Sequence, residues 1–174
     1  MTNSRRSPPP LDAAALEAMA LRYVERFATT RGKLAAYLSR KIRERGWAGE
    51  PLDPAIVAER MAALGYVDDR LFAEARARSL ARRGYGTRRV SQALRAAFVD
   101  PGDAAAVLEQ NDAHAFASAL AFARRRRFGP FAKTGSDERL RERQIAAMLR
   151  AGHSFALSRR IILSEPGDVP EADL

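Results

Sequence analysis

The sequence predicts an all-α protein, an elongated array of three tandem three-helix repeats. Alanine, the strongest helix former, fills 35 of the 174 positions, whereas Val, Ile and Thr are sparse. No stretch shows the sustained apolar and polar alternation of a half-buried strand. Apolar residues recur instead at helical spacing, and residues 55–100 contain no proline to interrupt them.

The first three helices are predicted from apolar spacing and from one clear boundary. Asp53 and Pro54 supply an N-cap and a first-turn proline for the third helix, which Gly65 ends. The apolar positions of the first two helices are Leu16, Met19, Ala20, Tyr23, Val24 and Phe27, followed by Leu34, Tyr37, Leu38 and Ile42.

The other six helices follow the same logic. Asp68 caps the fourth, which runs to Gly84, and a fifth is lined by apolar residues from Val90 to Phe98. Gly152 ends the eighth helix. The remaining helices are expected at 103–110, 116–123, 137–151 and 155–163.

The nine predicted helices repeat in sets of three. Residues 30–38 align with 86–94 at an offset of 56 residues, and residues 143–149 fit the same apolar pattern. Each aligned segment follows a longer amphipathic helix and precedes a shorter one. The expected organisation is a disordered leader at 1–10, repeats at 11–65, 66–111 and 112–163, and a flexible acidic tail at 164–174.

Charge indicates an anionic partner. The chain carries 30 basic and 21 acidic residues, a net charge of +9, and 27 of the basic residues are arginine. A GC-rich genome raises alanine and arginine together, but it explains neither this net excess nor its clustering. Each repeat has one basic focus, over residues 22–45, 70–95 and 124–150. The partner is therefore expected to be nucleic acid or an acidic protein surface.

Several function classes lack their signatures. The chain has no cysteine, which excludes disulfides, thiolate metal sites and a cysteine nucleophile. It shows no Gly-rich phosphate loop and no nucleophile elbow, so we expect no enzyme, catalytic residue, metal or cofactor. The start has no apolar signal segment, and the longest uncharged run inside the body, residues 113–123, is about half a membrane span. We expect a cytoplasmic monomer with no membrane contact.

The densest positive charge lies at a predicted helix break, residues 78–89, which we call the arginine elbow. Gly84 is expected to end one helix and Gly86 to cap the next. Tyr85 then precedes the cap, where a hydrophobic staple is a better interpretation than stacking on a base. Arg88 and Arg89 fall in a first helical turn, where the helix dipole disfavours cations, so binding rather than helix stability is expected to explain them.

Binding sites are predicted at the basic foci. The adjacent acids Asp68 and Asp69 are interpreted as helix-capping residues rather than metal ligands, and His114 and His153 as surface or packing residues. The candidate residues for binding a filament or nucleic acid are Arg78, Arg82, Arg83, Arg88, Arg89, Arg31, Lys33, Arg125, Arg126 and Arg143.

The stretch LGYVDDRLFAEARARSLARRGYGTRRVSQALRA, residues 64–96, resembles the RecX family, bacterial regulators of the RecA recombinase. The segments 123–131 and 143–157 also look like RecX, and the resemblance extends over roughly residues 15–163. At Ala97-Phe98 the chain departs from the family pattern, which often has a glycine closing that helix.

The resemblance implies three tandem three-helix repeats and a function. RecX-like proteins bind along the groove of the RecA–single-stranded-DNA filament and restrain ATP hydrolysis, strand exchange and coprotease activity. The implied partners are this filament and, weakly, single-stranded DNA alone. Two alternatives stay open. One is a stand-alone nucleic-acid-binding protein with a helix-turn-helix at 69–98 and a recognition helix at 87–98. The other is a helical scaffold that binds an acidic protein.

Overall fold

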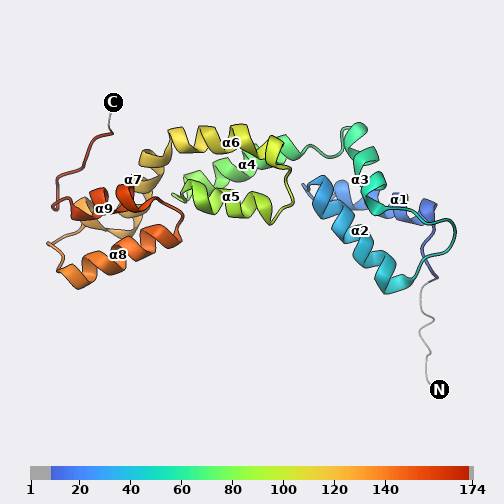
Figure 1. Cartoon of the computed structure of the whole chain (residues 1–174), viewed down its shortest axis with the longest axis horizontal. Helices are drawn as coiled ribbons and strands as arrows, with labels where there is room; N and C mark the ends of the chain where they lie inside the picture. Colours follow the sequence, from blue (N-terminus) through green and yellow to red (C-terminus); the bar gives the residue numbers. More distant parts are fainter. Residues whose placement is uncertain (1–8, 173–174) are drawn as a thin grey trace, which may run out of the picture. The chain divides into compact units, whose positions relative to one another are not determined.

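The computed structural model describes residues 9–172, which fold into nine α-helices and one 3₁₀ turn with no β-strand (Figure 1). The predicted all-α class is confirmed, and the helices follow one another as three sets of three. Most of the predicted leader, residues 1–8, lies outside the described range. The helices are α1 (Ala13–Val24), α2 (Arg31–Arg45), α3 (Pro54–Ala63), α4 (Asp69–Arg82), α5 (Thr87–Arg95), α6 (Pro101–Ala113), α7 (Ala115–Arg126), α8 (Glu138–Arg150) and α9 (Phe155–Leu163), with the 3₁₀ turn η1 (Gly129–Phe131) after α7.

The helix ends differ from prediction in at least three helices. α5 ends at Arg95 rather than at Phe98, because Phe98 adopts φ 55°, which is not a right-handed helical conformation. α6 begins at Pro101, directly after its cap Asp100, and is therefore longer than the predicted 103–110. α1 ends at Val24, before Phe27, whose ring instead packs 5.2 Å from the ring of Tyr23. No helix in residues 9–172 is long and apolar enough to cross a membrane.

The part of the predicted acidic tail that the structure describes makes contacts with the preceding helices. The backbone N–H of Gly167 donates to the carbonyl of Pro130 at 2.9 Å, and Glu165 pairs with Arg141 of α8 at 3.4 Å. Arg160 of α9 also donates to a carbonyl of the tail. Glu165 therefore offsets part of the basic charge of α8 locally.

The chain divides into two compact units, Met1–Phe72 with Ala97–Val99, and Ala73–Ala96 with Asp100–Leu174. In the first unit, α1, α2 and α3 pack against one another. Asp12, Thr30 and Asp53 cap these helices by accepting from first-turn N–H groups. The core is formed by Leu11, Leu16, Ala20, Leu34, Leu38, Val57, Ala58, Met61 and Val67.

The second unit contains the last two sets of helices. α5 packs against α6, and α9 packs against both α7 and α8. Val90 and Leu94 are the buried positions of α5, in agreement with the apolar pattern of the sequence. A second core joins α7, α8 and α9, with Tyr85 packed against it. Its buried members are Ala119, Phe122, Ala123, Met148, Ala151, Ile161 and Ile162.

Where the family often has a glycine, this chain has Ala97-Phe98, and a glycine of α2 lies against Phe98 instead. Phe98 adopts φ 55°, the left-handed conformation that favours glycine, and its side chain is exposed. Gly32 lies directly beside it, so that a Cβ at residue 32 would collide with the Cβ of Phe98. The hydroxyl of Thr30 also donates to the carbonyl of Ala97. A glycine on α2 therefore provides the space that Phe98 needs.

Candidate functional site

The arginine elbow has the backbone geometry that the sequence predicts. Gly84 has φ +73°, and the N–H groups of Gly84 and Tyr85 donate to the carbonyls of Ala81 and Leu80 at 2.7 and 3.1 Å. This is the Schellman pattern, which satisfies the last carbonyl groups of a helix. Gly86 is the N-cap of α5, as expected. The chain therefore turns between α4 and α5 within the four residues 83–86.

The elbow is fixed by close backbone contacts within the second unit. A Cβ at Gly84 would lie 2.9 Å from the backbone nitrogen of Phe122, and a Cβ at Gly86 would collide with the carbonyl of Gly152. The ring of His153 lies between these elements, with Nε2 3.0 Å from the carbonyl oxygen of Gly84. Two glycines are required here because α7 and the α8–α9 turn approach too closely for any side chain.

The first turn of α5 faces the end of another helix. The N–H groups of Gly86 and Arg88 donate to the carbonyls of Ala151 and Gly152, which follow α8, at 3.0 and 3.2 Å. These carbonyls carry the partial negative charge of a helix C-terminus and compensate the positive end of the α5 dipole. Arg88 and Arg89 lie in the first turn of α5, as expected, but these carbonyls weaken the unfavourable effect of the dipole on them, so the dipole argument for a binding role loses force.

The side chains of Arg82, Arg83, Arg88 and Arg89 are exposed. Among residues 9–172, no carboxylate lies within ion-pair distance of any of these four guanidinium groups. Arg83 lies over the ring of Tyr85, 5.1 Å from its centroid. Tyr85 itself is half-buried against the core of α7, α8 and α9, so its main role is packing.

One arginine of the third basic focus joins the elbow. Nη2 of Arg125, on α7, donates to the carbonyl of Arg82 at 3.1 Å. Arg126, the next residue, lies 5.7 Å from the ring of Phe122. The run at 124–127 therefore points in several directions, as expected for consecutive residues of a helix, and only part of it contributes to the elbow surface.

The candidates in the first unit are engaged in its own structure. Arg31 is partly buried, and its Nε and Nη1 lie 3.5 Å from carboxylate oxygens of Asp69 and Glu59. Although burial lowers the pKa of Arg31, these two carboxylates raise it above its ordinary value. Lys33 lies 5.3 Å from the centroid of the Phe72 ring. The basic focus at 22–45 thus includes side chains with structural roles.

Asp69 has a role that the sequence does not reveal. Its side chain is 3% exposed, and Oδ1 accepts from the backbone N–H of Arg31 at 2.8 Å. Asp68 instead caps α4 as predicted, by accepting from Leu71 at 2.8 Å. The two acids act separately, and no cluster of three or more metal-ligating side chains occurs among residues 9–172.

The last two candidates lie on exposed helix faces. Arg78 pairs with Glu74 one turn earlier on α4, at 3.4 Å, and Arg143 is exposed on α8.

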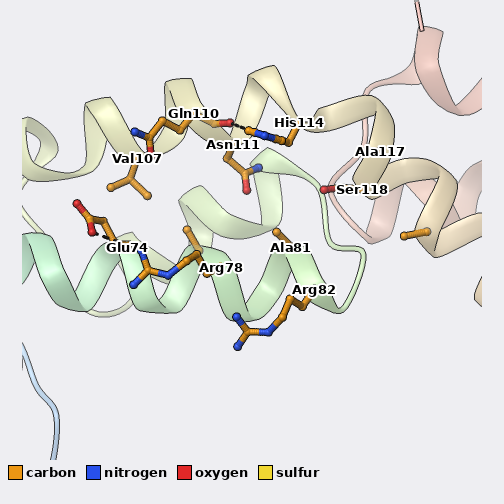
Figure 2. Close-up of a pocket in the computed structure, with 12 residues that line it drawn as sticks. Glu74, Arg78, Ala81, Arg82, Val107, Gln110, Asn111, His114, Ala117 and Ser118 are labelled. Carbon is orange, nitrogen blue, oxygen red and sulfur yellow. Dashed lines mark hydrogen bonds and ion pairs between the residues drawn. The ribbon is translucent and has the colours of Figure 1, made fainter. Parts of the chain in front are cut away.

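Arg78 and Arg82 also line a pocket of about 530 Å³ between α4, α6 and α7 (Figure 2). No pattern in the sequence indicates this pocket, because its lining combines residues of α4, α6, α7 and the α6–α7 junction. The full lining is Glu74, Ala77, Arg78, Ala81, Arg82, Val107, Gln110, Asn111, His114, Ala117, Ser118 and Ala121.

Comparison with known proteins places this arrangement in a family. The family model described as "RecX, second three-helix domain" matches residues 68–108, which include the arginine elbow. The chain is 34% identical over 162 residues to a regulatory protein RecX of Myxococcus xanthus, across 87% of this chain and 86% of the relative. It is 30% identical over 138 residues to a regulatory protein RecX of Agrobacterium fabrum, across 76% of this chain and 73% of the relative.

Solved crystal structures of RecX proteins have a fold similar to that of this chain. A crystal structure of RecX from Lactobacillus salivarius superposes with a TM-score of 0.61 at 17% sequence identity, across 86% of this chain and 93% of the other. A second crystal structure, of a regulatory protein RecX, gives a TM-score of 0.56 at 21% identity, across 85% and 72%. The sequence relatives and the shared helical fold lead to one conclusion: the chain belongs to the RecX family of regulatory proteins.

Proposed function

We propose that this protein binds the RecA–single-stranded-DNA filament and inhibits its ATP hydrolysis, strand exchange and coprotease activity, with no enzymatic activity or cofactor of its own. The observation that supports this most directly is the arginine elbow, where four exposed guanidinium groups lack a carboxylate partner within residues 9–172. Unpaired arginine on a fixed backbone suits phosphate or carboxylate. The relatives' name, regulatory protein, supports a non-enzymatic role.

A filament presents the same anionic surface many times along its length. Several weak contacts on one chain then add through effective concentration, so no single site has to be strong. Binding to bare single-stranded DNA is accordingly proposed to be weak. The proposal places the protein in the cytoplasm, as a monomer, within DNA recombination, repair and the SOS response.

ATP hydrolysis by RecA on single-stranded DNA, titrated with this protein, tests the proposal. Substoichiometric protein is expected to slow hydrolysis by a preformed filament. If a saturating excess leaves both hydrolysis and strand exchange unchanged, the proposed function is wrong whatever the fold.

The rival function, a helix-turn-helix at 69–98, is disfavoured by the packing of α5. A recognition helix reads bases with its N-terminal residues. In this chain the backbone at the N-terminus of α5 packs against Gly152, where an added Cβ would lie 2.5 Å from the backbone nitrogen of Arg89, so the exposed side chains of that first turn are arginines, which suit phosphate better than a base sequence. Side-by-side binding to single-stranded DNA, duplex DNA and a RecA filament separates this rival, and the acidic-protein scaffold, from the proposed function.

A further inference from the structure

We propose that the pocket between α4, α6 and α7 binds one nucleobase of a single DNA strand, with the adjoining phosphate on Arg78 and Arg82. The inference rests on the proposed function, because it assigns part of the filament's single-stranded DNA to a site in the second unit. The exposed arginines of the elbow account for contacts with phosphate, and the pocket would add a contact with a base.

The walls of the pocket suit a flat ring. Ala77 and Ala81 on α4 lie one helical turn apart, and so do Ala117 and Ala121 on α7. These side chains end at Cβ, so both helices present shallow apolar surfaces. The volume of about 530 Å³ lies in the range of small-ligand pockets and exceeds what a single base requires.

The floor of the pocket is polar and only partly satisfied. Asn111 and Ser118 are each 6% exposed. Asn111 donates through Nδ2 to the hydroxyl of Thr87 at 2.8 Å, which leaves its Oδ1 as an acceptor. The Ser118 hydroxyl makes no hydrogen bond within residues 9–172. Figure 2 shows Asn111 on α6 and Ser118 on α7, on either side of the α6–α7 junction.

This floor favours a base over an aliphatic side chain. The edge of a nucleobase carries adjacent donors and acceptors, so one group can donate to Asn111 Oδ1 while its neighbour accepts from Ser118. A leucine or phenylalanine anchor of a protein partner would bury both groups without a partner, which costs their full desolvation.

The rim supplies the charge for a phosphate. Arg78 and Arg82 line the α4 side of the pocket, and Arg125 donates to the backbone carbonyl of Arg82. Glu74 is the one acid of the lining and lies 3.4 Å from Arg78, where a phosphate would compete with it for the guanidinium. The net charge of the lining is positive and matches a nucleotide.

The test compares a short cytosine oligonucleotide, about twelve residues long, with an abasic strand of the same length, by fluorescence anisotropy at low salt. Ala117→Leu fills the pocket from an exposed position of α7, and Ser118→Ala removes one floor hydroxyl. Ala105→Leu, on an exposed part of α6 outside the pocket, is the matched control. Circular dichroism and melting temperature establish that each variant is folded.

Ala117→Leu is expected to weaken binding to the cytosine strand about tenfold or more, because the larger side chain takes the space of the base and removes its apolar contact with α7. Ser118→Ala is expected to weaken it about threefold, the loss of one hydrogen bond. Neither change should affect the abasic strand, and Ala105→Leu should affect neither strand. The inference is overturned if folded Ala117→Leu and Ser118→Ala bind both strands as the wild type does.

The result also distinguishes a protein ligand from DNA. If Ala117→Leu weakens binding to the RecA filament and to no oligonucleotide, the pocket takes a segment of RecA and the nucleobase proposal is wrong. If the wild type fails to inhibit RecA but the pocket variants still lose base-dependent binding, the proposed function fails and the nucleobase site stands.

Discussion

The Cβ of Phe98 occupies the space that a side chain at residue 32 would fill, so Gly32 and Phe98 are a matched pair in the first unit. At the start of α5 the corresponding close approach is between two glycines, Gly86 and Gly152. In the pair at residues 32 and 98, the left-handed residue is a phenylalanine, and the glycine lies on the helix it contacts.

The pair predicts a non-additive response to mutation. Gly32→Ala should destabilise the protein by about 1–3 kcal/mol, because the added methyl overpacks against Phe98, although Ala is otherwise the better helix former. Phe98→Gly removes the clash, and Gly32→Ala should then cost less than in the wild type. Urea denaturation of the two single variants and the double variant measures the coupling. Gly135→Ala is the control, because a Cβ there meets no atom within 4 Å. Additive effects would show that the two residues do not constrain each other.

The second prediction concerns the arginine elbow. Replacing Arg82, Arg83, Arg88 and Arg89 together with Ala should weaken filament binding strongly and leave the melting temperature nearly unchanged, since exposed substitutions cost within about 0.5 kcal/mol each. Because carbonyls after α8 compensate the dipole of α5, removing Arg88 and Arg89 should not stabilise that helix.

Salt titration identifies what the elbow contacts. If it contacts phosphate, binding to single-stranded DNA should lose about 0.7 in log–log slope for each contact removed. If it contacts acidic groups of RecA, filament binding should fall while binding to bare DNA changes little. A charge-matched control replaces four exposed arginines that are not candidates. Equal losses in both quadruple variants would mean that the elbow contributes no more to binding than other exposed arginines of the chain. The control positions are Arg22, Arg43, Arg139 and Arg159.

The third prediction concerns pH. Burial lowers the pKa of His153, although its hydrogen bond to the carbonyl of Gly84 acts in the opposite direction, and Nδ1 is buried without a partner. The unfolded state therefore binds a proton more readily than the folded state. The contribution of His153 to the free energy of unfolding should be fully present above about pH 6.5. It should fall by at most about 1.4 kcal/mol for each pH unit below that value, until the pH passes the lowered pKa of the folded state.

Two matched variants isolate this effect. His153→Gln retains an N–H for Gly84 but cannot titrate, so its stability should lose the pH dependence that His153 contributes below pH 6.5. His114→Gln changes the exposed histidine of the α6–α7 junction and is the matched control. Denaturant midpoints between pH 5 and 7.5 give the comparison, and identical slopes in all three proteins would exclude His153 as the source.

The fourth prediction separates structure from binding in the first unit. Asp69→Ala removes the partner of both the Arg31 guanidinium and its backbone N–H, and should cost more stability than Arg31→Ala. We expect about 1–3 kcal/mol for Asp69→Ala, and less than about 1 kcal/mol for Arg31→Ala because its guanidinium is one-third exposed. Filament affinity measured with Arg31→Ala decides whether Arg31 also binds. A large loss of affinity in a stable protein would make it a binding residue.

Local chemistry explains what the sequence alone could predict. Asp53, Asp68, Gly84 and Gly86 act on residues within a few positions of themselves, so caps and turns follow from the order of residues. The contact of Gly86 with Gly152 and the burial of Asp69 depend instead on how distant helices approach, and one sequence does not encode this visibly. The pocket could not be predicted for the same reason, because alanines that line it are also ordinary helix-forming residues.

The glycine contacts of the elbow have a consequence for the entropy of binding. The backbone at residues 84 and 86 lies against Phe122 and Gly152 with no side chain between them, so the turn is already ordered before any partner arrives. Association then has to immobilise only the arginine side chains, at about 0.5–1.5 kcal/mol each, and no loop. Such a preorganised turn should show slow amide hydrogen exchange at residues whose side chains are exposed to solvent.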